Sequence, residues 1–295
     1  MKATTVAAGI SVKNILYATD FSPVAEAAAP YAVELARHYG AKVMAVHVHS
    51  PLGYGLSPAE AWPALTEAYE REAKELKKRL DGFFRGVEHN LVIGEGDTWG
   101  VISALLEENK IDLIVMGTHG RKGLGRMVLG SVAEKILRRS PVPVLTIGPH
   151  VQIEASTAAK QILFVTNFSP ESDKAAEFAI ALAEENQAKL DMLHVIESPR
   201  SGEFIRLHDL VKATLARLQQ IITPDQALWC EPNFMVEEGE PAEQILNIAK
   251  RRGTNLIVMG VKRAVGDLGA ATHAPWPVAH QILSDARCPV LTIRS

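Results

Sequence analysis

An internal duplication constrains the fold of this chain more than any other feature of its sequence. The segment ATDFSP at 18–23 returns as VTNFSP at 165–170, a shift of 147 residues. The segment PVLTI at 143–147 returns unchanged at 289–293, a shift of 146 residues. Matching segments at nearly constant spacing indicate two copies of one domain in tandem.

The length and the joint between the copies fit this interpretation. A chain of 295 residues is long enough for two domains of ordinary size. A short polar stretch, IEASTAA, separates the copies and is typical of a linker. The sequence therefore predicts one domain over residues 1–150 and a second over 159–295.

Each copy alternates apolar strand patterns with amphipathic helix patterns. In the first copy we expect strands at 14–19, 42–49, 87–93, 113–116 and 144–147, and helices at 23–39, 65–83, 97–109 and 131–139. Such alternation predicts an α/β fold with a parallel sheet covered on both faces. Ligands on such sheets bind outside the carboxyl ends of the strands, where Asp20 and Gly117 lie.

A glycine-rich loop follows the apolar strand LIVMG at 113–117. Its spacing is Gly117-x2-Gly120-x9-Gly130-Ser131, and Ser131 opens a helix. The loop matches neither the P-loop pattern nor the dinucleotide pattern G-x-G-x-x-G. A strand, a glycine loop and a helix in this order place backbone N–H groups at a helix N-terminus, which attracts phosphate.

This spacing, together with the tandem repeat, resembles the universal stress protein (UspA-like) family in its ATP-binding branch. The resemblance covers nearly the whole chain. It implies two Rossmann-like domains of the adenine nucleotide alpha hydrolase-like kind, each a five-stranded parallel sheet of order 3-2-1-4-5 between helices. It also implies that the fifth strands, 144–147 and 290–293, pair antiparallel within the chain.

The resemblance further implies a site for ATP (or ADP/AMP) with Mg²⁺. Asp20, beside Thr19, would face the ribose and the metal-linked phosphate, and would act on the metal only through that phosphate. The backbone of Val48 would meet the adenine edge, and Met116 would line the pocket. The phosphates would be held by backbone N–H groups and the serine hydroxyl of a set of loop and helix residues, namely Gly117, Gly120, Gly130, Ser131 and Val132.

The second copy lacks several of these groups. Asp20 becomes Asn167, Gly120 becomes Arg263, and Gly130-Ser131 becomes Trp276-Pro277. Asparagine lacks the charge that pairs with phosphate-bound Mg²⁺, and proline has no N–H to offer an anion. The second copy is therefore expected to be structural or regulatory.

Two functions from different classes remain open. One is a nucleotide-dependent stress-response or signalling module; the other is an ATP hydrolase or nucleotidyl transferase on the same fold. No convincing general base apart from Asp20 is found, so the module is favoured and slow hydrolysis stays open. A scaffold that binds no nucleotide is the weakest alternative, because the first loop keeps its glycines.

Composition sets the remaining expectations. A net charge of −3 argues against broad nucleic-acid binding. No apolar run approaches a membrane span, and two cysteines, Cys230 and Cys288, fit a reducing cytoplasm. We also expect a homodimer of the tandem chain and an unidentified signalling partner.

Several single residues have two interpretations. Asp20 is either a ligand or a carboxylate that complements the helix start, and Ser131 is either an N-cap or a ligand. His119 either touches a phosphate or lies in a solvated loop. His47 and His194 occupy matching strand positions, and we interpret them as packed core histidines without a metal-ligand cluster.

Overall fold

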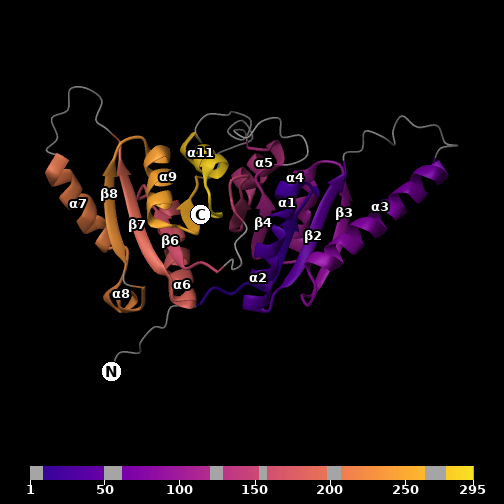
Figure 1. The fold of residues 1–295 in the computed structure, drawn as a ribbon, viewed down its shortest axis with the longest axis horizontal. Coiled ribbons are helices and arrows are strands. Elements are labelled where there is room, and N and C mark those ends of the chain that lie inside the picture. The colour runs from indigo at the N-terminus through magenta and orange to yellow at the C-terminus, as the bar shows by residue number, and fades with distance from the viewer. Residues whose placement is uncertain are drawn as a thin grey trace.

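The computed structural model describes residues 9–49, 62–119, 129–152, 158–197, 207–230, 232–262 and 277–294, without the side chains at 62–65 and 228. Its ten described strands form one continuous sheet in the order β3-β2-β1-β4-β5-β10-β9-β6-β7-β8 (Figure 1). The first half has the predicted order 3-2-1-4-5, and the second half mirrors it. The predicted fold class is confirmed.

The strands begin and end close to where the sequence places them. In the first half they are β1 (Asn14–Ala18), β2 (Lys42–His49), β3 (His89–Glu95), β4 (Leu113–Gly117) and β5 (Val144–Ile147). In the second half they are β6 (Gln161–Val165), β7 (Lys189–Ile196), β8 (Asn233–Glu238), β9 (Leu256–Gly260) and β10 (Val290–Ile293). Only β3 is displaced, by two residues from the predicted 87–93.

The helices connect these strands in the same order in each half. The first half contains α1 (Pro23–Glu26), α2 (Ala29–Tyr39), α3 (Trp62–Phe83), α4 (Thr98–Glu108) and α5 (Ser131–Arg139). The second half contains α6 (Pro170–Asn186), α7 (Leu207–Gln219), α8 (Pro224–Cys230), α9 (Pro241–Arg252) and α11 (Pro277–Asp285). Among the described residues, no helix combines the length and apolarity needed to cross a membrane.

The helix predicted over 23–39 is wrong in one respect, because it is two helices. Ser22 is the N-cap of α1, with its side chain accepting from the Ala25 N–H. The Ala25 carbonyl then accepts from the Ala28 N–H at 3.1 Å and from the Tyr17 hydroxyl at 2.7 Å. Pro30 has no N–H to continue the helical ladder, so α2 starts afresh with a proline in its first turn.

The two halves meet where β5 and β10 pair antiparallel, as the resemblance implied. Leu145 lies opposite Leu291, so a local two-fold axis passes through this pair. The hydroxyl of Thr146 donates to the Val290 carbonyl at 3.0 Å, and Thr292 donates to the carbonyl of Val144 at 3.3 Å. The reciprocal bonds make the seam an intrachain counterpart of a symmetric dimer interface.

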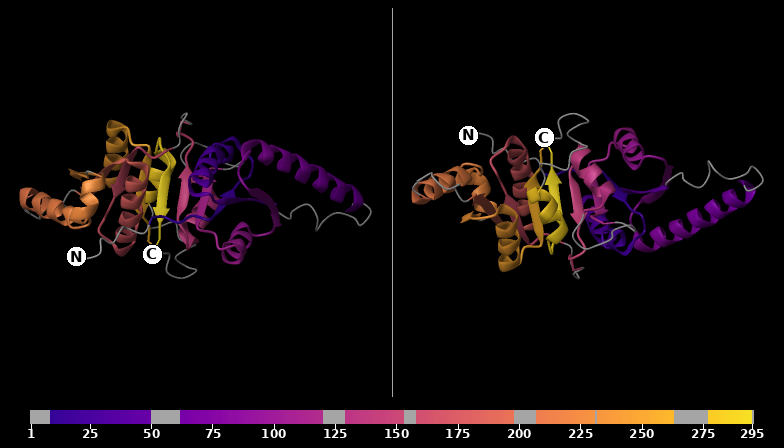
Figure 2. Two further views of the ribbon diagram at one scale, coloured as in Figure 1. Left: turned by 90° about the horizontal axis from the view of Figure 1, so that it is seen from below. Right: turned by 90° about the horizontal axis from the view of Figure 1, so that it is seen from above.

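Helices cover both faces of the sheet (Figure 2). Each face buries one apolar cluster that continues across the seam, since Leu145 and Leu291 belong to one cluster and Val144 and Val290 to the other. The amino-terminal segment adds a polar tie between the halves: the Ile10 N–H and the Tyr39 hydroxyl, both from the first half, each donate to Glu185 of α6 at 2.7 Å. The two apolar clusters therefore join the halves across the seam.

Candidate functional site

The carboxyl ends of β1, β2 and β4 lie at one edge of the sheet because the three strands are parallel neighbours. Thr19 and Asp20 follow β1, Val48 lies near the end of β2, and Gly117 ends β4. The loop after β4 returns to its starting point, because the Gly130 N–H donates to the Thr118 carbonyl at 2.9 Å. The start of α5 is thereby placed at the same edge as the strand ends.

The turn after β1 is fixed by its own side chains. The Phe21 N–H donates to the Thr19 hydroxyl at 2.9 Å, and the Ser22 N–H donates to Asp20 Oδ1 at 3.0 Å. Phe21 has a left-handed φ of 57°. Asp20 thus helps to build the turn into α1, as its structural interpretation predicted. Its carboxylate is also half-buried at the candidate site.

The start of α5 differs from the prediction in two ways. Gly130, not Ser131, is the N-cap residue, and Ser131 is the first helical residue with an exposed side chain. The Gly130 N–H is engaged by Thr118, so it is not available to a phosphate in this conformation. The N–H groups of Ser131 and Val132 belong to the first helical turn, where no helical carbonyl can accept from them. Val132 is also exposed, at 43%.

Gly117 has a packing reason to be glycine. A Cβ at this position would lie 2.9 Å from the Val24 carbonyl oxygen and 3.0 Å from Cα and N of Ala25. The end of β4 therefore contacts the backbone of α1 directly. Gly260 occupies the same place in the second half, and a Cβ there would come closer still, to 2.5 Å from backbone atoms of Glu171 and Ser172. Packing alone therefore explains why this position is glycine in both copies, and no ligand is needed to explain it.

Other predicted positions vary in how far the structure describes them. Met116 is buried at 3% exposure, and Val48 is half-buried against the same apolar cluster. Gly120 lies outside the described residues, as do Arg263 and Trp276. His119 is buried at 8% exposure, with Nδ1 2.8 Å from the Thr118 hydroxyl, so the solvated-loop interpretation is wrong.

The second copy supplies a direct comparison. Its helix α11 begins at Pro277 and has the same length as α5, which begins at Ser131. The two helix starts are therefore equivalent, and one offers an N–H where the other has none. Asn167 replaces Asp20, is exposed, and accepts from the Ser169 N–H at 3.1 Å. The second copy therefore keeps the turn but lacks the carboxylate charge of Asp20.

Burial affects one titratable group beside this edge. It raises the pKa of the Tyr17 hydroxyl well above its usual value, so the group stays protonated near neutral pH. The hydroxyl donates to the Ala25 carbonyl at 2.7 Å. Tyr17 therefore acts as a structural donor that holds α1 in place, and it is not a candidate base.

The prediction that no metal-ligand cluster surrounds His47 is also wrong. His47 is buried at 5% exposure, but His49 of the same strand and Glu72 of α3 bring possible ligand atoms within 4.8 Å of one another and of His47. The sequence signal was His47-Val48-His49, because alternate strand residues share a face. Nothing local in the sequence places Glu72 against them.

A cavity of about 120 Å³ lies at the opposite edge of the sheet, over the seam between α2 and α6. Asp112, Pro143, Asn255 and Pro289 line it, and they precede β4, β5, β9 and β10. The cavity therefore lies at the amino ends of these strands. It is not the predicted nucleotide site.

Comparison with known proteins agrees with the fold and the duplication. The model of the universal stress protein family matches residues 11–148 and again 158–294. A universal stress protein of Methanocaldococcus jannaschii is 36% identical over 138 residues, which cover 46% of this chain and 81% of that protein. One of Thermus aquaticus is 34% identical over 137 residues, or 46% of this chain and 98% of that protein. Each relative thus corresponds to about one copy.

A solved structure covers both copies together. The universal stress protein from Archaeoglobus fulgidus DSM 4304 has a TM-score of 0.71 and 19% identity, covering 97% of this chain and 99% of that one. This likeness shows the shared fold. From the two family matches, the chain belongs to the universal stress protein family, as a tandem of two of the family's domains.

Proposed function

We propose that the first half, residues 1–150, binds an adenine nucleotide, ATP with Mg²⁺ or its ADP and AMP relatives, at the carboxyl edge of β1, β2 and β4. In this proposal the second half, residues 159–295, is a degenerate copy that supports the first. The chain then acts as a nucleotide-dependent stress-response or signalling module.

One observation carries the proposal: the two equivalent helix starts are chemically unequal. Ser131 opens α5 with an N–H and a hydroxyl, whereas Pro277 opens α11 with neither. The fold tolerates both residues, because proline is well accepted in the first turn of a helix. Packing therefore does not require Ser131, and of the two helix starts only that of α5 offers this N–H and hydroxyl.

In this proposal the described residues contact different parts of the nucleotide. The N–H groups of Ser131 and Val132 and the Ser131 hydroxyl would donate to phosphate oxygens at the positive end of α5. Asp20 would face the ribose and the Mg²⁺-bound phosphate, and Thr19 fixes its turn through the bond from the Phe21 N–H at 2.9 Å. Val48 and Met116 would line the adenine side. Bound Mg²⁺ would supply charge that offsets the phosphates.

Two predicted residues take a smaller part in this proposal than the resemblance implied. Gly117 is required by packing against α1, and the Gly130 N–H is already bonded to Thr118 at 2.9 Å. In this proposal Gly117 allows β4 to pack against α1, and Gly130 fixes the start of α5 at the carboxyl ends of the strands. Gly120 stays a prediction.

The test exchanges the unequal residues between the copies. Ser131→Pro removes one N–H and one hydroxyl while keeping a residue suited to a helix start. Each charge-assisted hydrogen bond contributes about 1.5–3 kcal/mol, so calorimetric titration with Mg-ATP should show a loss of affinity of roughly tenfold or more. Pro277→Ser is the matched control, and it should leave the affinity of the first half unchanged. Equal affinity in wild type and Ser131→Pro would refute the site.

The enzyme alternative is an ATP hydrolase or nucleotidyl transferase at the same edge. Turnover of Mg-ATP by the full chain separates the two, because a module releases phosphate slowly or not at all, whereas an enzyme turns over repeatedly. We favour the module, since Asp20 is the acidic side chain that we assign to the nucleotide and it also builds its own turn. We further propose that the tandem chain forms a homodimer and acts through a signalling partner; sedimentation of the purified chain tests the dimer.

A further inference from the structure

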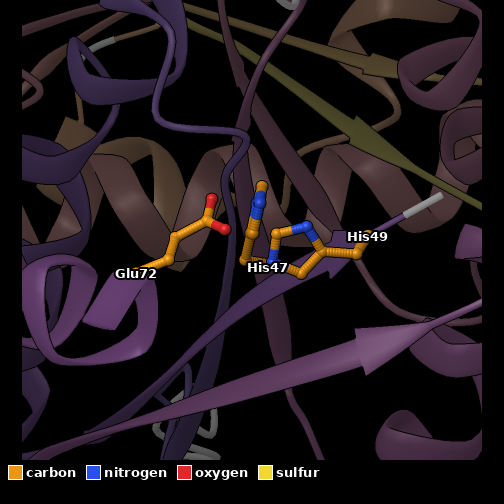
Figure 3. Close-up of side chains that lie close together, drawn as sticks. All are labelled: His47, His49 and Glu72. Atoms are coloured by element: carbon orange, nitrogen blue, oxygen red, sulfur yellow. The ribbon is translucent and has the colours of Figure 1, made fainter. Parts of the chain in front are cut away.

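We propose that His47, His49 and Glu72 form a binding site for a divalent first-row transition metal such as Zn²⁺. The two histidines project from one face of β2, and Glu72 projects toward them from α3 (Figure 3). One possible ligand atom from each residue lies within 4.8 Å of the other two. This site adjoins the proposed nucleotide site, because His47 contacts the Thr19 carbonyl, but it shares no assigned ligand residue with that site and the proposal does not require nucleotide binding.

The tautomer of His47 suits a metal ligand. Its Nδ1 lies 2.8 Å from the Thr19 carbonyl, and a carbonyl can only accept, so Nδ1 carries the proton. Nε2 is then the nitrogen with a lone pair. Metal-bound histidines usually donate their other N–H to a carbonyl or carboxylate in this way, which fixes the ring. The Phe21 ring, 5.3 Å away in an edge arrangement, further restricts it.

His49 has a nitrogen that the protein does not satisfy. In the part of the chain that the structure describes, its Nε2 is buried and has no hydrogen-bond partner. Its ring is held between His47, at 4.6 Å, and Tyr69, at 5.0 Å between centroids. A buried nitrogen without a partner is costly, and metal coordination is one way to satisfy an imidazole.

The donor set selects the class of metal. Two imidazoles and one carboxylate suit Zn²⁺ and its transition-metal neighbours, whereas Mg²⁺ and Ca²⁺ prefer oxygen ligands throughout. Bonds of about 2.1 Å in a tetrahedral site place ligand atoms about 3.4 Å apart. The three possible ligand atoms lie within 4.8 Å of one another, and rotation of the long Glu72 side chain, half-buried on α3, can bring its carboxylate to bonding distance. Three protein ligands leave a coordination position open.

Comparison with the second copy shows which of the two histidines is common to both halves and which is found only in the first. His194 repeats the contact of His47, with Nδ1 2.8 Å from the Thr166 carbonyl. The position of His49 is taken by Ile196, the last residue of β7. The histidine that bonds the turn is therefore part of the shared architecture. His49 is specific to the first copy, and with it the possibility of a second imidazole ligand.

The test measures metal binding by the full chain, stripped of metal and without nucleotide. Zn²⁺ is titrated by calorimetry, and Co²⁺ is followed by its visible absorption, which is intense in a tetrahedral site with nitrogen ligands. Wild type should bind one equivalent. His49→Ile, which copies the second half, and Glu72→Gln should each lower the affinity about tenfold or more. His194→Gln is the control and should bind like wild type.

Circular dichroism and thermal melting of each variant show that it is folded, and they use no metal. His47→Gln is left as a secondary variant because it also removes the bond to Thr19. The proposal is overturned if wild type shows no saturable binding of Zn²⁺ or Co²⁺. It is equally overturned if folded His49→Ile and Glu72→Gln bind the metal as tightly as wild type, because the metal then sits on other histidines.

Discussion

Replacing Gly260 by alanine tests how closely the end of β9 approaches α6. Gly117 at the end of β4 makes the matching approach to α1 in the first half. The added Cβ would lie 2.5 Å from C and O of Glu171 and from N of Ser172. These are backbone atoms of α6, which is 17 residues long and packed on the sheet. No side chain can rotate away, so the helix or the strand must shift by most of an ångström. The backbone of Gly260 itself lies outside the left-handed region, so alanine adds no conformational strain.

Overpacking of this kind costs about 1–3 kcal/mol. A loss of 1 kcal/mol lowers the melting temperature of a chain of this size by roughly 2–4 °C, so Gly260→Ala should melt several degrees below wild type. Gly117→Ala should lose less, because its Cβ would meet α1 at 2.9–3.0 Å. The expected order of melting temperatures is therefore wild type, then Gly117→Ala, then Gly260→Ala.

Gly82→Ala is the matched control. Gly82 lies in α3, and a Cβ there would meet nothing within 4 Å. Alanine in a helix is favoured over glycine by roughly 0.5–1 kcal/mol, so this variant should melt at or slightly above the wild-type temperature. Thermal melts by circular dichroism at one protein concentration compare all four proteins. A Gly260→Ala protein that melts with wild type would refute the packing argument.

Three further predictions concern buried polar groups and a thiol. Thr146→Val removes the hydroxyl that donates to the Val290 carbonyl across the seam at 3.0 Å; the free energy of unfolding in urea should fall by about 0.5–1.5 kcal/mol. Arg252→Met leaves the Asp191 carboxylate, 1% exposed, without its ion pair at 2.9 Å; unfolding should become easier by about 3 kcal/mol, the low end for a broken buried pair, because Arg252 is partly exposed. Burial raises the pKa of the Cys288 thiol from 9.0 to about 12, so iodoacetamide at pH 8 should label it only after denaturation. Because the unfolded thiol ionises first, stability should also decline as pH rises from 9 toward 12.

Each of these has an outcome that contradicts it. Equal urea midpoints for wild type and Thr146→Val would show that the seam hydroxyl contributes nothing. Arg251→Met is the control for Arg252, because Arg251 pairs with Glu237 at the surface with its side chain 66% exposed; equal losses in the two variants would contradict the role of buried Asp191. Labelling of native Cys288 at the rate of the denatured chain would show that burial does not protect the thiol.

Local signals in the sequence predicted much of the fold. The apolar run of β4 and the polar residues Ser22 and Asp97 before two helices act within a few residues, and both side chains accept an N–H of the first helical turn. The duplication extended these predictions to the second half, and the family resemblance implied the antiparallel seam between β5 and β10. One local signal was overlooked, because Pro30 marks the break between α1 and α2.

The candidate site, like the fold, was predicted only in part from the sequence. The sequence showed that Ser131 and Pro277 stand at equivalent helix starts, and it placed Asp20 with Gly117 at the carboxyl ends of the first-half strands. It did not show that the Gly130 N–H is bonded to Thr118, or that Gly117 is needed for contact with α1. Both facts depend on how a loop and a helix return to the strand that they follow.

By itself, the sequence determined the order of the elements, the doubling of the domain and the chemical inequality of its two helix starts, because each is written in neighbouring residues or in a repeat. Only the tertiary structure decided which groups are already bonded and which distant side chains meet. Glu72 faces His47 and His49 because α3 packs along the sheet at one particular rotation, and that rotation is set by the whole core and by no short stretch of sequence.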